Sequence, residues 1–125
     1  MNDPRWASID AFAEENRDNI LRDITRLVAV PSVEGEAAPG APFGPGPKAA
    51  LAKALEIAEE LGLSTCNADS YIGWAETGTI ADDQKFLATI THTDVVPEGN
   101  GWDADPCTDP DATFRLQISP MCYTE

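Results

Sequence analysis

Residues 86–102 decide how the chain folds and read Phe-Leu-Ala-Thr-Ile-Thr-His-Thr-Asp-Val-Val-Pro-Glu-Gly-Asn-Gly-Trp. The first five residues are nearly all apolar, which is typical of a central strand that is buried on both faces of a sheet. His92, the only histidine of the chain, and Asp94 follow this run directly. Because ligand sites in open α/β sheets gather at the carboxyl ends of strands, we expect both side chains to lie at such a site.

The spacing of His92 and Asp94 suits a metal site. Residues i and i+2 of an extended segment point the same way, about 6–7 Å apart at the backbone. One side chain can then bind a metal ion while the other accepts the second imidazole N–H, an arrangement that fixes the ring and its tautomer. The pattern His-x-Asp by itself is short, so a purely structural role for His92 stays open at this point.

Two helices are expected upstream. Apolar residues between Ile9 and Val28 fall on one stripe and predict an amphipathic helix that ends before Pro31. Residues 34–47 hold four prolines and four glycines and are expected to form a flexible connector. A second helix is predicted from about Lys48 to Leu61, with Gly62 as the residue that terminates it.

Three strands are predicted to follow these helices. They comprise 63–67, 71–76 and 86–91, with 77–85 as a hairpin connection between the last two. Two helices followed by about three strands indicate an α/β layer architecture. We therefore expect a partial α/β/α domain whose sheet is incomplete.

Composition excludes some classes of partner. The chain has 22 acidic and 8 basic residues and a net charge of −14, which disfavours nucleic acid and anionic membranes as partners. No apolar run approaches the roughly 20 residues of a membrane span, and no signal peptide is expected at the N-terminus. The three cysteines, Cys66, Cys107 and Cys122, are odd in number and widely spaced, which suits free thiols in a reducing cytoplasm.

Four stretches together resemble a known enzyme family. They are Leu-Val-Ala-Val-Pro-Ser-Val (27–33), Ala-Pro-Phe-Gly-Pro-Gly (41–46), Asp-Ser-Tyr-Ile-Gly (69–73) and the stretch 86–106. They resemble the co-catalytic zinc peptidases, which include acetylornithine deacetylase, succinyl-diaminopimelate desuccinylase, carboxypeptidase G and the PepV-type dipeptidases. The form Asp-Val-Val-Pro-x-Gly-x-Gly-Trp is most similar to the dipeptidase branch.

The resemblance implies hydrolysis of small peptides by a cytoplasmic metallodipeptidase. It implies two divalent metal ions, usually zinc with manganese or cobalt as alternatives, that activate a shared water. His92 matches the first metal-ligand histidine, and Asp94 matches the catalytic-site aspartate that orients it. In this family a homodimer is an option through a domain that these 125 residues do not include.

The resemblance divides the chain in two. Residues 1–106 match the N-terminal part of the metallopeptidase catalytic domain, and 107–125 are a divergent tail that lacks the family's Gly-Arg-Gly, Asp-Asp-Lys-Gly and catalytic Glu-Glu segments. Asp82-Asp83 and Glu59-Glu60 lie upstream of His92, and we expect them to be a solvated turn and a charged helix face. With so few ligands, we expect the truncated chain alone to bind no metal tightly and to be inactive. The alternatives are a non-catalytic acidic binding module, a split-enzyme half that associates with another chain, and a soluble domain in which His92 is structural.

Overall fold

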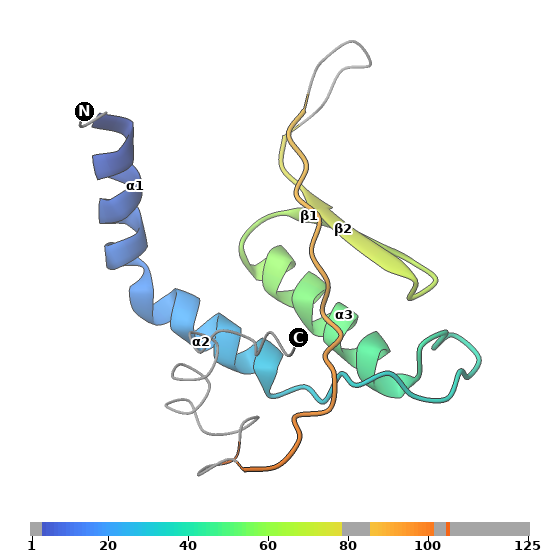
Figure 1. The fold of residues 1–125 in the computed structure, drawn as a ribbon. Helices are drawn as coiled ribbons and strands as arrows, with labels where there is room; N and C mark the ends of the chain where they lie inside the picture. The colour runs from blue at the N-terminus through green and yellow to red at the C-terminus, as the bar shows by residue number, and fades with distance from the viewer. Residues whose placement is uncertain (1–3, 79–85, 102–104, 106–125) are drawn as a thin grey trace, which may run out of the picture.

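The structure, a computed structural model, describes residues 4–78, 86–101 and 105. The elements run in the order α1 (Pro4–Glu15), α2 (Arg17–Val28), α3 (Pro45–Glu60), β1 (Ser64–Ala68) and β2 (Ile72–Glu76) (Figure 1). The described residues therefore form a small α/β arrangement of three helices and one two-stranded antiparallel sheet. This agrees in outline with the predicted α/β class, although the number of helices and strands differs.

The prediction of a single helix over 9–28 is wrong, because the helix is interrupted at Asn16. This residue has φ −98° and ψ 8°, outside the helical range. Its side-chain Nδ2 and its backbone N–H both donate to the carbonyl of Phe12, at 2.9 and 3.0 Å. Asparagine side chains compete with the backbone in this way and so weaken a helix interior. Figure 1 shows the resulting bend, with α1 directed away from the rest of the molecule.

Helix α3 begins earlier than predicted, at Pro45, and ends at Glu60, one residue before the predicted end, with Gly62 just beyond it as the terminating residue. Proline suits the first helical position because its fixed φ is helical and its missing N–H would have no partner there. At the other end Gly62 has φ 82°, and the N–H groups of Gly62 and Leu63 donate to the carbonyls of Glu59 and Ala58 at 2.9 and 3.0 Å. These two bonds form a Schellman motif, which confirms the predicted role of Gly62.

The loop before α3 is more ordered than a flexible connector. The N–H of Gly35 donates to the carbonyl of Phe43 at 3.0 Å, and Ala38 and Ala41 form an isolated antiparallel bridge. Ala41 is only 5% exposed. The loop therefore folds back on itself and returns the chain to the start of α3.

Strands β1 and β2 form a tight hairpin and confirm the predicted strands 63–67 and 71–76. Asp69 and Ser70 have φ values of 53° and 61°, and the N–H of Tyr71 donates to the carbonyl of Ala68 at 3.0 Å. Positive φ at both central positions is the type I′ geometry that matches the twist of a hairpin. The side chain of Asn67 also accepts the N–H of Ser70 at 2.8 Å. The predicted hairpin connection at 77–85 lies mostly outside the described residues.

The prediction of a central strand at 86–91 is wrong. These residues form no strand, and the side chains of Leu87 and Ile90 are 94% and 99% exposed. Strand structure depends on a hydrogen-bonded neighbour, and no described strand lies beside this segment. Figure 1 shows residues 86–101 in orange as an extended stretch that passes the hairpin and α3.

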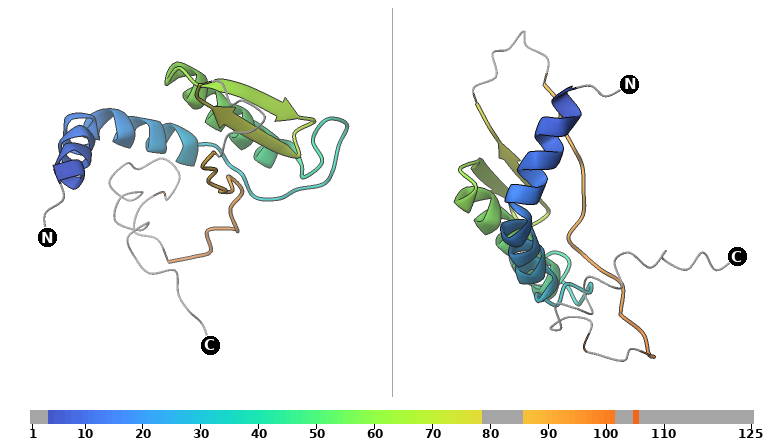
Figure 2. Two further views of the ribbon diagram at one scale, coloured as in Figure 1. Left: turned by 90° about the horizontal axis from the view of Figure 1, so that it is seen from above. Right: turned by 90° about the vertical axis from the view of Figure 1, so that its left-hand side faces the viewer.

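The main packing contact lies between the hairpin and one face of α3, as Figure 2 shows. Gly73 on β2 sits so close to α3 that a Cβ atom there would lie 2.9 Å from Leu51 and 3.0 Å from Leu55. Apart from this contact the described core is small. Its buried apolar side chains are Ala41, Pro47 and Ala50, and its buried polar one is Ser32.

Candidate functional site

The candidate site lies where residues 92–96 meet residues 31–33. Val33 and Val95 form an isolated parallel bridge, and the N–H of Val95 donates to the carbonyl of Ser32 at 3.3 Å. Two stretches that are far apart in the sequence therefore lie side by side. Sequence reasoning treated Pro31-Ser32-Val33 only as the exit of a helix and missed this contact, since a long-range backbone bridge leaves no local pattern.

The structure brings His92 and Asp94 together. His92 Nδ1 lies 2.9 Å from the backbone carbonyl of Asp94 and 3.4 Å from its carboxylate Oδ1. Both neighbours are oxygen acceptors, so Nδ1 carries the proton in this arrangement. In the neutral imidazole the lone pair is then on Nε2. The side chains of His92 and Asp94 are 80% and 62% exposed, so Nε2 is accessible to a ligand.

The described residues offer only part of a metal site. Zinc sites use three or four protein ligands in close geometry. Within the described ranges no group of three or more histidine, cysteine, aspartate or glutamate residues is placed to hold a metal ion. One imidazole with an adjacent carboxylate suits a single metal ligand and its positioning group, so a complete site needs further ligands from outside these residues.

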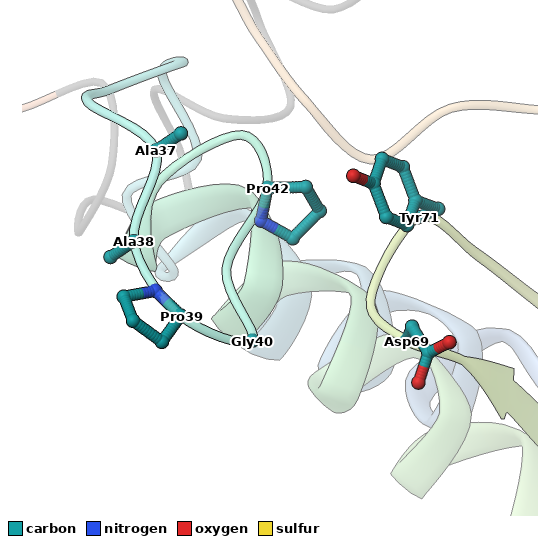
Figure 3. A pocket seen from close by; sticks show the side chains of 7 residues that line it. All are labelled: Ala37, Ala38, Pro39, Gly40, Pro42, Asp69 and Tyr71. Atoms are coloured by element: carbon teal, nitrogen blue, oxygen red, sulfur yellow. The ribbon is translucent and has the colours of Figure 1, made fainter.

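A hollow lies near the hairpin turn, and neither His92 nor Asp94 is among the residues that line it. It is open, has a volume of about 480 Å³, and is shown in Figure 3. Its lining residues are Ala37, Ala38, Pro39, Gly40, Pro42, Asp69 and Tyr71. Tyr71 also meets Phe43 edge to face, with ring centroids 5.6 Å apart. This contact ties the loop before α3 to the hairpin turn.

An ion cluster joins α2 to α3. Arg26 donates to both carboxylate oxygens of Glu60, with Nη2 2.8 Å from Oε1, and Nη2 also lies 2.9 Å from Glu56 Oε1. Its Nη1 lies 3.2 Å from Asp23 on the same helix. Two-pronged pairs of this kind exploit the planar fork of the guanidinium group. The Arg26 side chain is 27% exposed, so it is partly enclosed between the helices.

This cluster shifts the titration of its carboxyl groups. The hydrogen bond from Arg26 lowers the pKa of Glu60, and the hydrogen bond from Lys53 is the main cause of the lowered pKa of Glu56. Glu60 was expected to lie on a charged outer face together with Glu59. Both glutamates are exposed as expected, but each has a partner, since Glu59 accepts a hydrogen bond from Thr65.

The remaining predicted features are partly described. Cys66 lies on β1 as an exposed free thiol, while Cys107, Cys122 and Asp82-Asp83 lie outside the described residues. None of α1, α2 and α3 has the length and apolar character that a membrane-spanning helix requires.

Comparison with known proteins links this chain to peptidases. It is 39% identical over 92 residues to putative dipeptidase YtjP of Bacillus subtilis, a match that covers 72% of this chain and 19% of that protein. Putative dipeptidases from two strains of Staphylococcus aureus are also 39% identical, over 95 residues that cover 74% of this chain and 20% of each protein. The chain thus spans about a fifth of the length of the curated relatives it matches. No family model matches the chain. The similarity to these relatives fits a peptidase family.

Proposed function

We propose that this chain contributes to a metal-dependent dipeptidase. The observation that carries the proposal is the 39% identity over 92 residues to a protein named as a putative dipeptidase. The exposed His92–Asp94 pair supports it, because an imidazole with Nδ1 held by an acceptor leaves Nε2 for a metal ion.

The proposed roles follow from the geometry and from the zinc-peptidase resemblance. His92 is a metal ligand through Nε2, and Asp94 is a positioning residue that holds the imidazole through Nδ1. Two divalent metal ions, zinc or alternatively manganese or cobalt, would supply a bound water whose pKa is lowered toward neutrality. The substrate class is a small peptide. The described residues include no complete ligand set, so we expect no turnover from the chain by itself.

A chimera tests this proposal directly. The matched region of the Bacillus subtilis relative is replaced by the corresponding part of this chain, and hydrolysis of a dipeptide panel is followed with zinc, manganese or cobalt. The relative itself serves as the positive reference. We expect metal-dependent turnover that His92→Ala abolishes and that Asp94→Asn reduces by about ten- to a hundredfold.

Two outcomes would contradict the proposal. One is a folded, inactive chimera alongside an active reference. The other is full turnover in the His92→Ala chimera, which would exclude His92 as a required ligand. His92→Ala in the isolated chain is a separate check, since loss of stability regardless of added metal would favour a structural histidine.

A second candidate function is that of a split-enzyme half or binding module that associates with another polypeptide. The exposure of Leu87 and Ile90, at 94% and 99%, favours it, because large exposed apolar side chains in one segment commonly mark an interaction surface. Size-exclusion chromatography is performed on the chain with the remaining part of the relative. A stable active complex supports the split enzyme, a stable inactive complex supports the module, and two separate peaks count against both.

A further inference from the structure

We propose that residues 31–33 form a positioning strut that sets the place of His92 and Asp94 relative to α3, with Gly46 as the residue on which the strut rests. The inference rests on the proposed function, because it concerns how the same site is held. It assigns Ser32, Val33 and Gly46 a role through the backbone, without contact to substrate or metal.

The contact between the strut and α3 is made by backbone atoms. A Cβ atom on Gly46 would lie 2.6 Å from the carbonyl oxygen of Pro31, 3.2 Å from that of Val33 and 3.4 Å from Cα of Ser32. A separation of 2.6 Å is far inside van der Waals contact. All three neighbouring atoms belong to the backbone, so none of them can move aside as the flexible end of a side chain could. At this point α3 and the strut therefore leave no room for any residue larger than glycine.

The opposite side of the strut holds the candidate site. The carbonyl of Ser32 accepts the N–H of Val95 at 3.3 Å, and Val33 pairs with Val95 in a parallel bridge. Val95 follows Asp94 directly, and the carbonyl of Asp94 accepts the His92 ring N–H at 2.9 Å. A continuous series of close contacts therefore leads from Gly46 through Ser32 and Val33 to the imidazole.

Two further features restrain the strut. Ser32 is only 3% exposed, although the segments around it lie mostly at the surface. The loop that follows is held close to the start of α3, because a Cβ atom on Gly44 would lie 2.9 Å from Cα of Gly35. Ser32, the buried residue of the strut, thus lies between α3 and the site segment, so we expect a displacement at Gly46 to reach Val95.

The single histidine of the chain gives a direct test, because its imidazole NMR signals report on His92 alone. The test compares the wild-type chain with Gly46→Ala by ¹H–¹⁵N imidazole spectra without metal, followed by Co²⁺ titration. We expect Gly46→Ala to change the imidazole ¹⁵N shifts, because the displaced backbone at Val95 alters the geometry between His92 Nδ1 and the neighbouring carbonyl of Asp94. We also expect about a tenfold weaker effect of Co²⁺ on these signals.

Gly73→Ala is the matched control. It also introduces a Cβ atom at close range, but against the side chains of Leu51 and Leu55 on the hairpin side of α3. A general loss of stability would affect both variants alike, whereas the strut predicts that only Gly46→Ala alters the His92 signals. Unchanged signals in a folded Gly46→Ala chain, or equal changes in both variants, would overturn the inference.

If Gly46→Ala does not fold, the strut is tested on the wild-type chain instead. A nuclear Overhauser effect between Val33 and Val95 must then be observed, together with slowed exchange of the Val95 amide, and the absence of both rejects the strut. Failure of the proposed function is distinguishable. If Co²⁺ leaves the wild-type His92 signals unchanged, the ligand role is rejected, while the metal-free comparison still tests the strut.

Discussion

Gly44 and Gly78 both adopt a positive φ, at 91° and 77°, but only Gly44 also has a close neighbour. A positive φ in a non-glycine residue costs roughly 1–3 kcal/mol, and the combination of φ 91° with ψ 172° at Gly44 is adopted almost only by glycine. A Cβ atom at Gly44 would also meet the backbone of Gly35 at 2.9 Å, whereas at Gly78 no atom of the described residues lies within 4 Å. Gly44 therefore combines a backbone conformation that strongly favours glycine with a steric contact, whereas Gly78 shows only the positive φ.

We predict that Gly44→Ala destabilises the chain more than Gly78→Ala does. The Gly78 variant should lose about 1 kcal/mol, from strain alone. The Gly44 variant should lose a further 1–3 kcal/mol or so, as is typical of an overpacked contact. Urea denaturation followed by circular dichroism measures both. Equal losses would mean that the backbone at Gly35 moves aside freely.

Some single residues could be predicted from the sequence and others could not. Gly62 was identifiable because a glycine after a periodic helix favours the left-handed terminating conformation. His92 and Asp94 were found from their spacing, and the structure brings them into contact. The break at Asn16 was missed because it depends on a side-chain hydrogen bond that competes with a helix whose apolar pattern continues on both sides.

At the scale of elements, α2 and α3 are joined by Arg26 and the carboxylates of Glu56 and Glu60. The pKa of each glutamate is lowered from its ordinary value of 4.5 in the folded chain. Near pH 4.5 the unfolded chain therefore binds more protons than the folded chain, so the free energy of unfolding rises as the pH rises. The contribution is present above about pH 4.5 and is lost as the pH falls through the lowered values.

We predict that Arg26→Gln reduces stability at neutral pH and flattens its decline in acid. The variant removes the charge that spans the two helices and that is the main cause of the lowered pKa of Glu60. Arg17→Gln is the matched control, because Arg17 pairs only with the exposed Asp18 among the ion pairs described and lies on the same helix as Arg26. Thermal unfolding between pH 3 and 7 gives the measurement. An acid decline in Arg26→Gln as steep as in the wild-type chain would rule out this origin.

The hairpin and α3 give a second prediction for elements. Leu55→Ala should cost about 1–2 kcal/mol, below the range for a fully buried leucine because this side chain is half-buried. Gly73→Ala should cost about 1 kcal/mol by overpacking. The double variant should be more stable than the sum implies, because the new methyl group at 73 fills space left by Leu55. A double-mutant cycle in urea checks this, and strict additivity would contradict the contact.

Strands β1 and β2 could be predicted from the local sequence pattern, whereas the third expected strand, at 86–91, was predicted wrongly. The turn at Asp69 and Ser70 fixes β1 against β2 within a few residues, so local chemistry suffices. Residues 86–91 have an equally strong apolar pattern, yet a strand needs a neighbour that local pattern cannot supply. The contacts of Ser32 with Val95 and of Arg26 with Glu60 were missed for the same reason, because each joins distant parts of the chain.

At the scale of the whole molecule, large apolar side chains are exposed in several of the described regions, among them α1, the hairpin and the segment 86–90. Trp6 and Phe12 on α1 are each 65% exposed, and the segment that contains Leu87 and Ile90 is almost fully exposed. Such surfaces promote association. A net charge of −14 opposes self-association by repulsion, so the balance depends on ionic strength.

We predict that the chain self-associates as salt concentration rises and that the variant Leu87→Ser with Ile90→Ser does so less. The free energy of unfolding should change by no more than about 0.5 kcal/mol, because both residues lie at the surface. Leu61→Ser is the control, since Leu61 is 68% exposed but lies at the end of α3. Sedimentation at several salt concentrations measures association. If the Leu61 variant has the same effect, the segment at 86–90 is not the associating surface.

The central position of α3 determines which parts of the molecule open most readily. Among the described elements it contacts α2, β1 and β2, whereas α1 contacts α2 alone. An element with a single neighbour can detach without disturbing the others, so its amide hydrogens should exchange with deuterium at a rate close to that of an isolated helix. The amides of α3 are released only when its neighbours separate from it. The protection of amide hydrogens from exchange should therefore rise from α1 through α2 to α3, because each successive helix has more neighbours.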